Sequence, residues 1–456
     1  MTKKIVFSCL LAAATLSGCH IYRPYERPAS VTVSDSLFRR PIAIDDTASL
    51  ATLSWKQLFT DPWLQQYIET GLQQNTDLNV ARLRVKEAEA LLMNARLGYL
   101  PTADASAQGT LTSSDGSKAA KAFKLAASAD WEIDIFGKQL NAHRGAKSVL
   151  EQQQAYEQAV QTQLIATIAN SYYSLLMLDK QVDITRRTAA TWAEHLRTMK
   201  ALKRAGTTTE LAVAQTEAQK LAVDASLLSL ERQVNEMENS LSTLLGQVPQ
   251  RLERSSIDEQ RFPDTLCTGV PLQLLARRPD VRQSEAQLAE AYYATNAARA
   301  AFYPSLTLSG SAGWTNGSGM AVTNPATWLL QAVGSLVQPL FQQGRNIANL
   351  KVAKAQQEEA LLTFRQSLLD AGAEVNDALM RWQTARGRIR LDAQQTQMLR
   401  SALRSSELLM QHSSQNYLEV ITARRDLLQA ELTEATDRFD EIQGVISLYH
   451  ALGGGY

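Results

Sequence analysis

The sequence predicts a mainly α-helical fold that also carries membrane-spanning β-strands. Three observations support this prediction: the chain repeats once, long proline-free stretches carry heptad spacing, and short segments between them alternate with period two. The 456 residues include 46 basic and 46 acidic side chains, so the formal net charge is zero. This balance disfavours a nucleic-acid-binding protein.

The first 18 residues are expected to form an export signal. Lys3 and Lys4 precede an apolar run of about 12 residues, which is too short to cross a bilayer as a helix because that takes ~20 residues. Leu16-Ser17-Gly18-Cys19 resembles the bacterial lipobox, which implies cleavage before Cys19 and attachment of lipid, including palmitate, at that residue. The alternative is an ordinary signal with an incidental cysteine.

His20 follows Cys19 in place of the aspartate that retains many lipoproteins in the inner membrane, so an outer-membrane location is favoured. Residues 19–61 are expected to be an extended segment because prolines interrupt them.

The rest of the chain reads as two similar halves. Ala-Arg-Leu-Gly-Tyr-Leu-Pro at 95–101 matches Ala-Arg-Ala-Ala-Phe-Tyr-Pro at 298–304, and Gly137-Lys138 matches Gly344-Arg345. The matches predict repeats at 62–248 and 271–456, joined by a linker at 249–270. Each half is expected to contain a short helix, a β-hairpin, a very long helix and a returning helix.

Heptad spacing predicts the long helices. No proline occurs at 102–248 or 340–456, and apolar residues there step by three and four, which is typical of coiled-coil seams. The helix expected at about 137–204 would be about 100 Å long. The helices expected at about 209–245 and 416–452 would return antiparallel to the long ones. Periodicity alone also fits a soluble helical bundle. The seams are Leu164, Ile168, Ser171, Leu175, Leu178 and Leu361, Phe364, Leu368, Ala371, Val375, Ala378, Trp382.

Four strands are expected, at about 102–112, 123–136, 305–315 and 328–340. In the second of them apolar side chains such as Leu125 and Trp131 alternate with polar ones such as Lys124 and Glu132. The lengths match the ~9–11 residues of a tilted transmembrane strand. Two soluble hairpins with one buried face are the alternative. Because four strands cannot close a barrel and lipid tolerates no open edge, several chains would have to share one barrel.

Several motifs of the chain together resemble those of a known family. The residues that carry the resemblance are the lipobox, Ala298 to Pro304, Arg277-Arg278-Pro279-Asp280, Gln343-Gly344-Arg345 and the final Leu-Gly-Gly-Gly-Tyr. Together they resemble the TolC-like outer membrane factors of bacterial efflux systems, and most closely their NodT/OprM-like lipoprotein branch. That branch serves pumps of the resistance–nodulation–division (RND) type.

The resemblance implies a homotrimer with a 12-stranded barrel in the outer membrane and a helical tunnel in the periplasm. It also implies a periplasmic adaptor and an inner-membrane RND-type pump as partners.

The resemblance further implies a periplasmic gate near the turn into the last helix. Glu419 falls on one acidic gate position, and Thr422 stands where relatives carry a second acid, so a gate of two acidic rings is in doubt. Arg424, about one turn further on, could hold the gate by ion pairs. The alternative for Glu419 is a solvated glutamate favoured by the dipole at the helix start.

The function expected from these observations is a passive exit duct for small toxic compounds and drugs. No hydrolase, P-loop or metalloprotease motif occurs, and we expect neither enzymatic activity nor a cofactor or resident metal. The alternatives are the same duct for metal ions or for an ATP-driven exporter, and a periplasmic structural coiled-coil lipoprotein.

Overall fold

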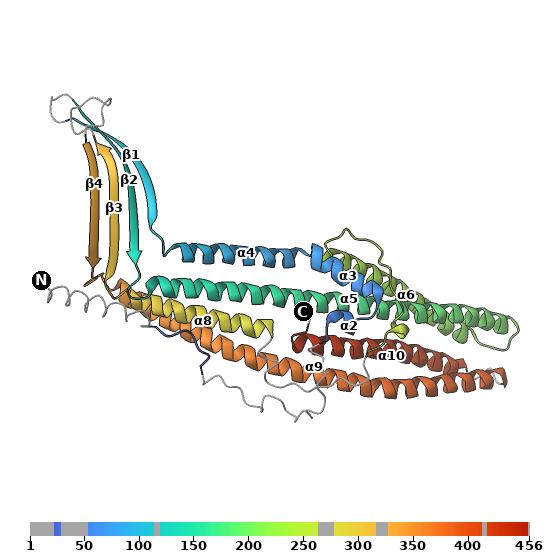
Figure 1. Ribbon diagram of the computed structural model, residues 1–456. Helices are drawn as coiled ribbons and strands as arrows, with labels where there is room; N and C mark the ends of the chain where they lie inside the picture. Colours follow the sequence, from blue (N-terminus) through green and yellow to red (C-terminus); the bar gives the residue numbers. More distant parts are fainter. Residues whose placement is uncertain are drawn as a thin grey trace. The chain divides into compact units, whose positions relative to one another are not determined.

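The computed structural model describes residues 22–28, 53–113, 119–262, 278–315, 327–412 and 417–454. The expected signal peptide at 1–18 and Cys19 lie outside these ranges. The chain divides into two compact units, and each unit draws on both sequence halves. The strand unit comprises residues 1–32, 83–155 and 282–367, and the hairpin unit comprises 33–82, 156–281 and 368–456. Figure 1 shows the order of the elements along the chain.

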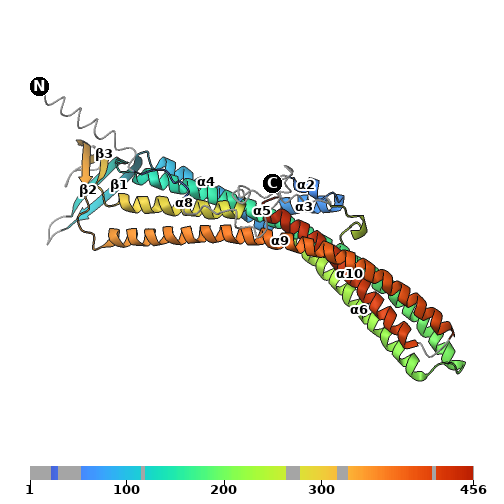
Figure 2. The same cartoon turned by 90° about the horizontal axis from the view of Figure 1, so that it is seen from below.

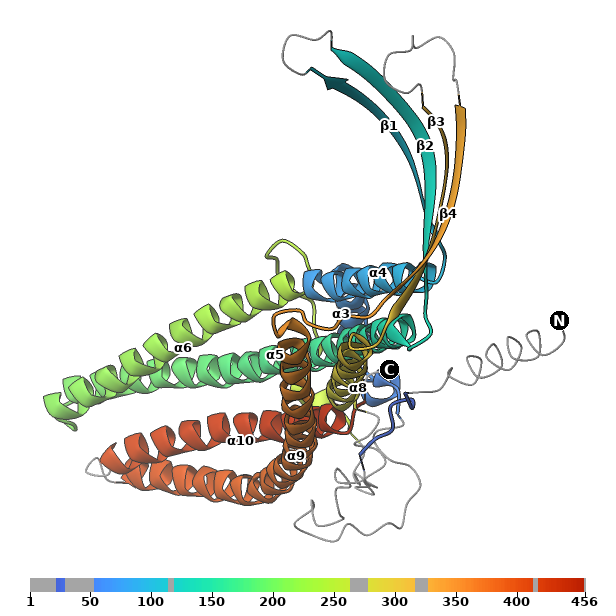
Figure 3. The same ribbon diagram turned by 90° about the vertical axis from the view of Figure 1, so that its left-hand side faces the viewer.

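The strand unit contains one antiparallel sheet in the order β1-β2-β3-β4 (Figure 3). The strands are β1 (Thr102–Thr112), β2 (Ala120–Ile133), β3 (Ser305–Thr315) and β4 (Thr327–Val337).

Two strands differ from the expected bounds. β2 covers 120–133 instead of 123–136: it starts earlier because Ala120 to Ala122 still pair with β1. It ends at Ile133, and the Asp134 carboxylate then accepts a hydrogen bond from the backbone N–H of Leu140 at 2.7 Å at the start of the next helix. β4 ends at Val337 instead of 340, because Pro339 has no N–H to give to a ladder.

Four helices contribute residues to both units. They are α4 (Thr76–Leu97), α5 (Lys138–Arg204), α8 (Pro279–Ala300) and α9 (Arg345–His412). In the strand unit, the described N-terminal residues 22–28 lie against α8. The backbone N–H of Tyr25 donates to the Tyr293 hydroxyl at 3.0 Å, and the Arg27 guanidinium pairs with Glu285.

The hairpin unit contains α6 (Glu210–Leu244) and α10 (Tyr417–Ala451), which pair with the distal parts of α5 and α9 (Figure 2). Gly206 has φ +76° at the turn between α5 and α6, and the Thr209 side chain caps α6 by accepting from the N–H of Ala212. Residues 413–416, expected as the other turn, lie outside the described residues. Heptad positions such as Ile168, Leu175 and Val375 are buried.

Short elements close one end of the hairpin unit. They are α2 (Trp55–Leu58), α3 (Pro62–Gln74) and the 3₁₀ turn η4 (Ile257–Glu259). Asp61 caps α3 through the N–H of Trp63 at 2.9 Å and also accepts from the Tyr172 hydroxyl at 2.7 Å and from the Gln260 amide at 2.9 Å. Among the described helices, none combines the length and apolarity needed to cross a membrane.

Candidate functional site

The register of the sheet separates its apolar side chains from its polar ones. Directly paired residues of antiparallel strands place their side chains on the same face, and most cross-strand rows between β2, β3 and β4 are either apolar or polar. Three rows gather apolar or small residues on one face: Ala127, Ala312 and Leu330; Trp131, Leu308 and Gly334; Ile133, Leu306 and Leu336.

The opposite face of the sheet is polar. Its rows include Ser128, Ser311 and Gln331, and next to the strand ends Glu132, Thr307 and Ser335. The Ser309 hydroxyl donates to the Asp130 carboxylate at 2.5 Å on this face. The pairing of the strands thus aligns their alternating residues, so that one face of the sheet suits lipid and the other suits water.

The apolar face is exposed within one chain. Leu330 is 80% and Leu336 is 66% exposed, which a monomer in water would not favour. In addition, β1 and β4 each pair with only one neighbour among the described strands. The strand unit therefore presents two unpaired edges and an uncovered apolar surface.

Aromatic rings lie at the ends of the strands that adjoin the helices, as expected for a membrane interface. The rings of Phe136 and Tyr303 stack with their centroids 5.0 Å apart, and the indole N–H of Trp131 donates to the carbonyl of Tyr99 at 2.9 Å. These contacts fix the ends of the strands where the chain turns into the helices.

The predicted gate residues lie in the first turns of α10. Glu419 is exposed in the first turn and Thr422 is half-buried. Arg424 is largely buried and donates to Glu407 of α9 at 2.6 Å. The structure therefore pairs Arg424 with Glu407 and leaves Glu419 at the surface of the chain.

Arg424 also contacts the first hairpin through residues that sequence reasoning missed. Its guanidinium carbon lies 6.0 Å from the ring centroid of Trp192, and that ring meets the imidazole of His195 edge-on at 6.0 Å. Burial and the nearby Arg424 lower the pKa of His195 to about 4. Trp192 packs with Val223 and Ile421, so this cluster joins α5, α6 and α10. The spacing of Trp192 and His195, one helical turn apart, was the available signal.

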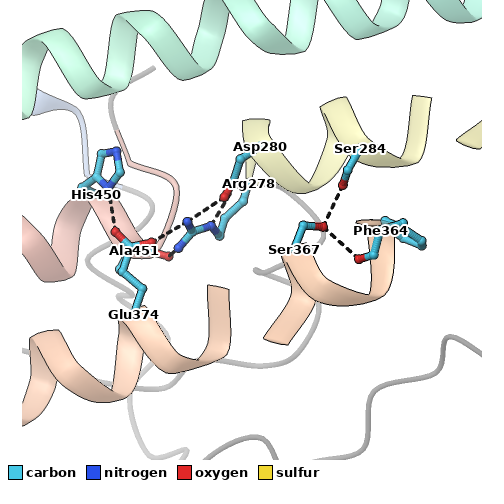
Figure 4. Close-up of polar contacts among 8 residues, drawn as sticks. All are labelled: Arg278, Asp280, Ser284, Phe364, Ser367, Glu374, His450 and Ala451. Carbon is cyan, nitrogen blue, oxygen red and sulfur yellow. Dashed lines mark hydrogen bonds and ion pairs between the residues drawn. The ribbon is translucent and has the colours of Figure 1, made fainter. Parts of the chain in front are cut away.

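Arg278 and Asp280 of the Arg-Arg-Pro-Asp motif take part in an ion-pair cluster in the hairpin unit, with Arg278 buried at its centre (Figure 4). The Arg278 guanidinium, 5% exposed, donates to Asp280 at 2.8 and 3.0 Å, to Glu374 at 2.6 Å and to the carbonyl of Ala451 at 2.7 Å. Burial alone would raise the pKa of Glu374, but the hydrogen bond with His450 and the charge of Arg278 outweigh it and lower the pKa to about 2.

The terminal glycines Gly453 and Gly454 pack beside this cluster, close to Arg278 and Tyr449. Gly453 has φ +76°, and a Cβ on Gly454 would overlap the ring of Tyr449.

In the strand unit, the hydroxyls of Ser284 and Ser367 lie 2.7 Å apart and link α8 to α9 (Figure 4). These contacts hold neighbouring helices together.

A sheet with one apolar and one mostly polar face is typical of a membrane protein whose strands separate lipid from water. The family model described as "Outer membrane efflux protein" matches residues 67–247 and 270–454. The pyoverdine export outer membrane protein OpmQ of Pseudomonas putida is 31% identical over 416 residues, which are 88% of each chain. The cation efflux system protein CusC of Escherichia coli is 25% identical over 97% of each chain.

A solved structure of the same kind aligns over nearly the whole chain. The open state of the MtrE outer membrane channel of Neisseria gonorrhoeae superimposes with a TM-score of 0.86 and 27% identity, covering 96% of this chain and 98% of that one. The chain belongs to the outer membrane efflux protein family. It is an efflux channel of the outer membrane with a helical tunnel in the periplasm, and it is not an enzyme.

Proposed function

We propose that three copies of this chain form one exit duct, in which the four strands of each copy contribute to a shared 12-stranded barrel. The observation that carries the proposal is the four-stranded sheet with two unpaired edges and an exposed apolar face. Pairing β4 of one copy with β1 of the next removes every edge, as lipid requires. The polar face then lines the lumen.

The mass of the detergent-solubilised protein tests this proposal. Light scattering that subtracts the detergent should give three times the mass of the mature chain. A monomer, or a mass of two or four chains, would overturn the 12-stranded barrel. Imaging the same sample by negative stain should show an elongated particle.

A lipid anchor at Cys19 is the second part of the proposal. The support is the lipobox sequence at 16–19, and several acyl chains anchor a protein far more firmly than one does. Intact-mass spectrometry of the membrane-extracted protein should show an acylated chain that begins at residue 19. The Cys19→Ser variant should lack the acyl mass, and an acylated variant would refute the assignment.

The partners of the duct are proposed to be a periplasmic adaptor and an inner-membrane pump of the RND type, and the cargo small toxic organic compounds. Among the described residues, no three His, Cys, Asp or Glu side chains gather to hold a metal ion. Metal export is the second candidate because of the similarity to a cation efflux protein. Expression in a strain that lacks its own efflux channels, followed by growth with organic toxins or with metal salts, distinguishes the two.

A periplasmic gate at Glu419 is the last part of the proposal. Glu419 is exposed at the start of α10, where three copies around an axis would form an acidic ring. Thr422 would contribute a polar ring without charge. Arg424 supports the gate indirectly, because its pair with Glu407 and its contact with Trp192 hold the first turns of α10 against α9 and α5.

A further inference from the structure

Two aspartates, Asp392 of α9 and Asp437 of α10, lie side by side and hold carboxylate oxygens that accept no hydrogen bond. The side chain of Asp437 on α10 is fully buried. Both of its oxygens, and Oδ2 of Asp392 on α9, are shielded from solvent and accept no hydrogen bond from the described residues. Buried polar atoms in this state are rare, because each unmade hydrogen bond costs about 1–3 kcal/mol.

The charges around the pair do not balance. Arg388 of α9 approaches Asp437 with Nη2 at 2.5 Å from Oδ1, but half of the Arg388 side chain is exposed. Asp440, one turn along α10, lies 3.9 Å from the same guanidinium. Arg388 is thus shared by Asp437 and Asp440, and Asp392 adds a third carboxylate beside Asp437. From α5, the neighbouring contact to α10 is made by the uncharged Gln181, which donates to Thr436 at 3.1 Å.

A single proton resolves both problems. Two ionised carboxylates can only accept, so neither can satisfy the other. A protonated carboxyl donates to its neighbour, which supplies the missing hydrogen bond and removes one of the repelling charges. We propose that Asp392 and Asp437 share a proton and form a protonation-dependent clasp that holds α10 against α9. The clasp is intact in acid and weakens when the proton is lost.

The direction of the pH effect follows from the environment of Asp437. The pKa of Asp437 is raised to about 7, first by burial and next by the neighbouring Asp392 carboxyl, while Arg388 opposes the shift. An aspartate in the unfolded chain titrates near pH ~3.9. The folded state therefore binds the proton more tightly, and the clasp loses stability as the pH rises from about 4 to about 7. Above that range the loss is complete.

Hydrogen–deuterium exchange of the full-length protein in detergent tests the clasp. Peptides that cover α10 around Asp437 should open about tenfold or more often at pH 8 than at pH 5.5, after correction for the intrinsic rate. In Asp437→Asn the amide replaces the shared proton, and the difference between the two pH values should disappear. Asp392→Asn should have the same effect and serves if the first variant does not fold.

Asp440→Asn is the matched control, because Asp440 lies on the same helix but outside the shared hydrogen bond, and it should keep the pH difference. Infrared spectra should also show a protonated carboxyl band at pH 5.5 that weakens by pH 8 and is absent from Asp437→Asn. Exchange that is independent of pH in the wild type, or a pH difference that survives both asparagine variants, would overturn the clasp. Neither outcome bears on the oligomeric state or on Glu419.

Discussion

Arg278 shows how a motif that marks the family acts as a structural residue. Its guanidinium satisfies two carboxylates and a helix-terminal carbonyl at once. Arginine suits this position because its planar donors reach several acceptors in fixed directions. In this chain the motif therefore stabilises the packing of helices.

Replacing Arg278 by alanine should lower the free energy of unfolding by about 2–3 kcal/mol, because Glu374 and the Ala451 carbonyl lose their partner. The partly exposed partners, 47% for Asp280 and 39% for Glu374, keep the loss below that of a fully buried pair. Denaturant unfolding of the solubilised protein measures it. Arg232→Ala, which breaks an exposed pair on α6, should change stability by less than about 0.5 kcal/mol.

His195 should make the hairpin unit sensitive to acid. Its pKa in the fold is lowered to about 4 by burial and by Arg424, whereas the unfolded side chain titrates near ~6.5. Stability is therefore complete above about pH 6.5 and falls as the pH drops toward 4, by up to about 1.4 kcal/mol per pH unit from this site.

Thermal unfolding between pH 7 and 4.5 tests the effect of His195. His195→Gln should flatten the loss in that range, whereas Trp192→Phe, a change in the same cluster, should keep the slope. A slope that is equal in the wild type and in His195→Gln would show that other groups carry the acid response.

In the strands, apolar and polar residues alternate, and the register between strands decides which face of the sheet each row of side chains occupies. Leu330 and Gln331 are neighbours in sequence, but their rows lie on opposite faces of the sheet. A lysine on the lipid face near the bilayer midplane costs about 2–4 kcal/mol, whereas a lumen position tolerates charge.

Leu330→Lys should therefore reduce the amount of folded, heat-modifiable protein in the outer membrane, and its stability in lipid vesicles should fall by about 2–4 kcal/mol. Gln331→Lys is the matched control and should assemble normally. Equal effects of the two substitutions would mean that the sheet does not separate lipid from water.

At the scale of the assembly, three copies of Glu419 would concentrate negative charge at the periplasmic entrance. Like charges around a narrow axis attract cations and repel anions. A single glutamate at the start of a helix would have no such effect on permeation, so ion selectivity separates the gate from the alternative of a solvated first-turn residue.

In planar bilayers, Glu419→Gln should lower the preference for cations over anions, and the difference from the wild type should shrink at high salt because salt screens the ring. Asp426→Asn, on the same helix but paired with Arg425, is the control and should leave the reversal potential unchanged. An unchanged reversal potential in Glu419→Gln would refute the acidic ring.

The sequence by itself determined the helical and β-strand character of this protein and its family. Heptad spacing and period-two alternation are local consequences of which side chains face a partner, so they could be found without the fold. Strand ends such as Ile133 and Val337 needed the structure, because capping by Asp134 and the position of Pro339 decide them together.

Only the tertiary structure decided which residues meet, both within a repeat and between the two repeats. It pairs Arg424 with Glu407 and Trp192, buries His195 beside them and brings Asp392 to Asp437. It also combines both sequence halves in each compact unit. The physical reason is that burial and long-range electrostatic contacts depend on how helices pack, and residues more than 200 positions apart leave no periodic signal of their contact.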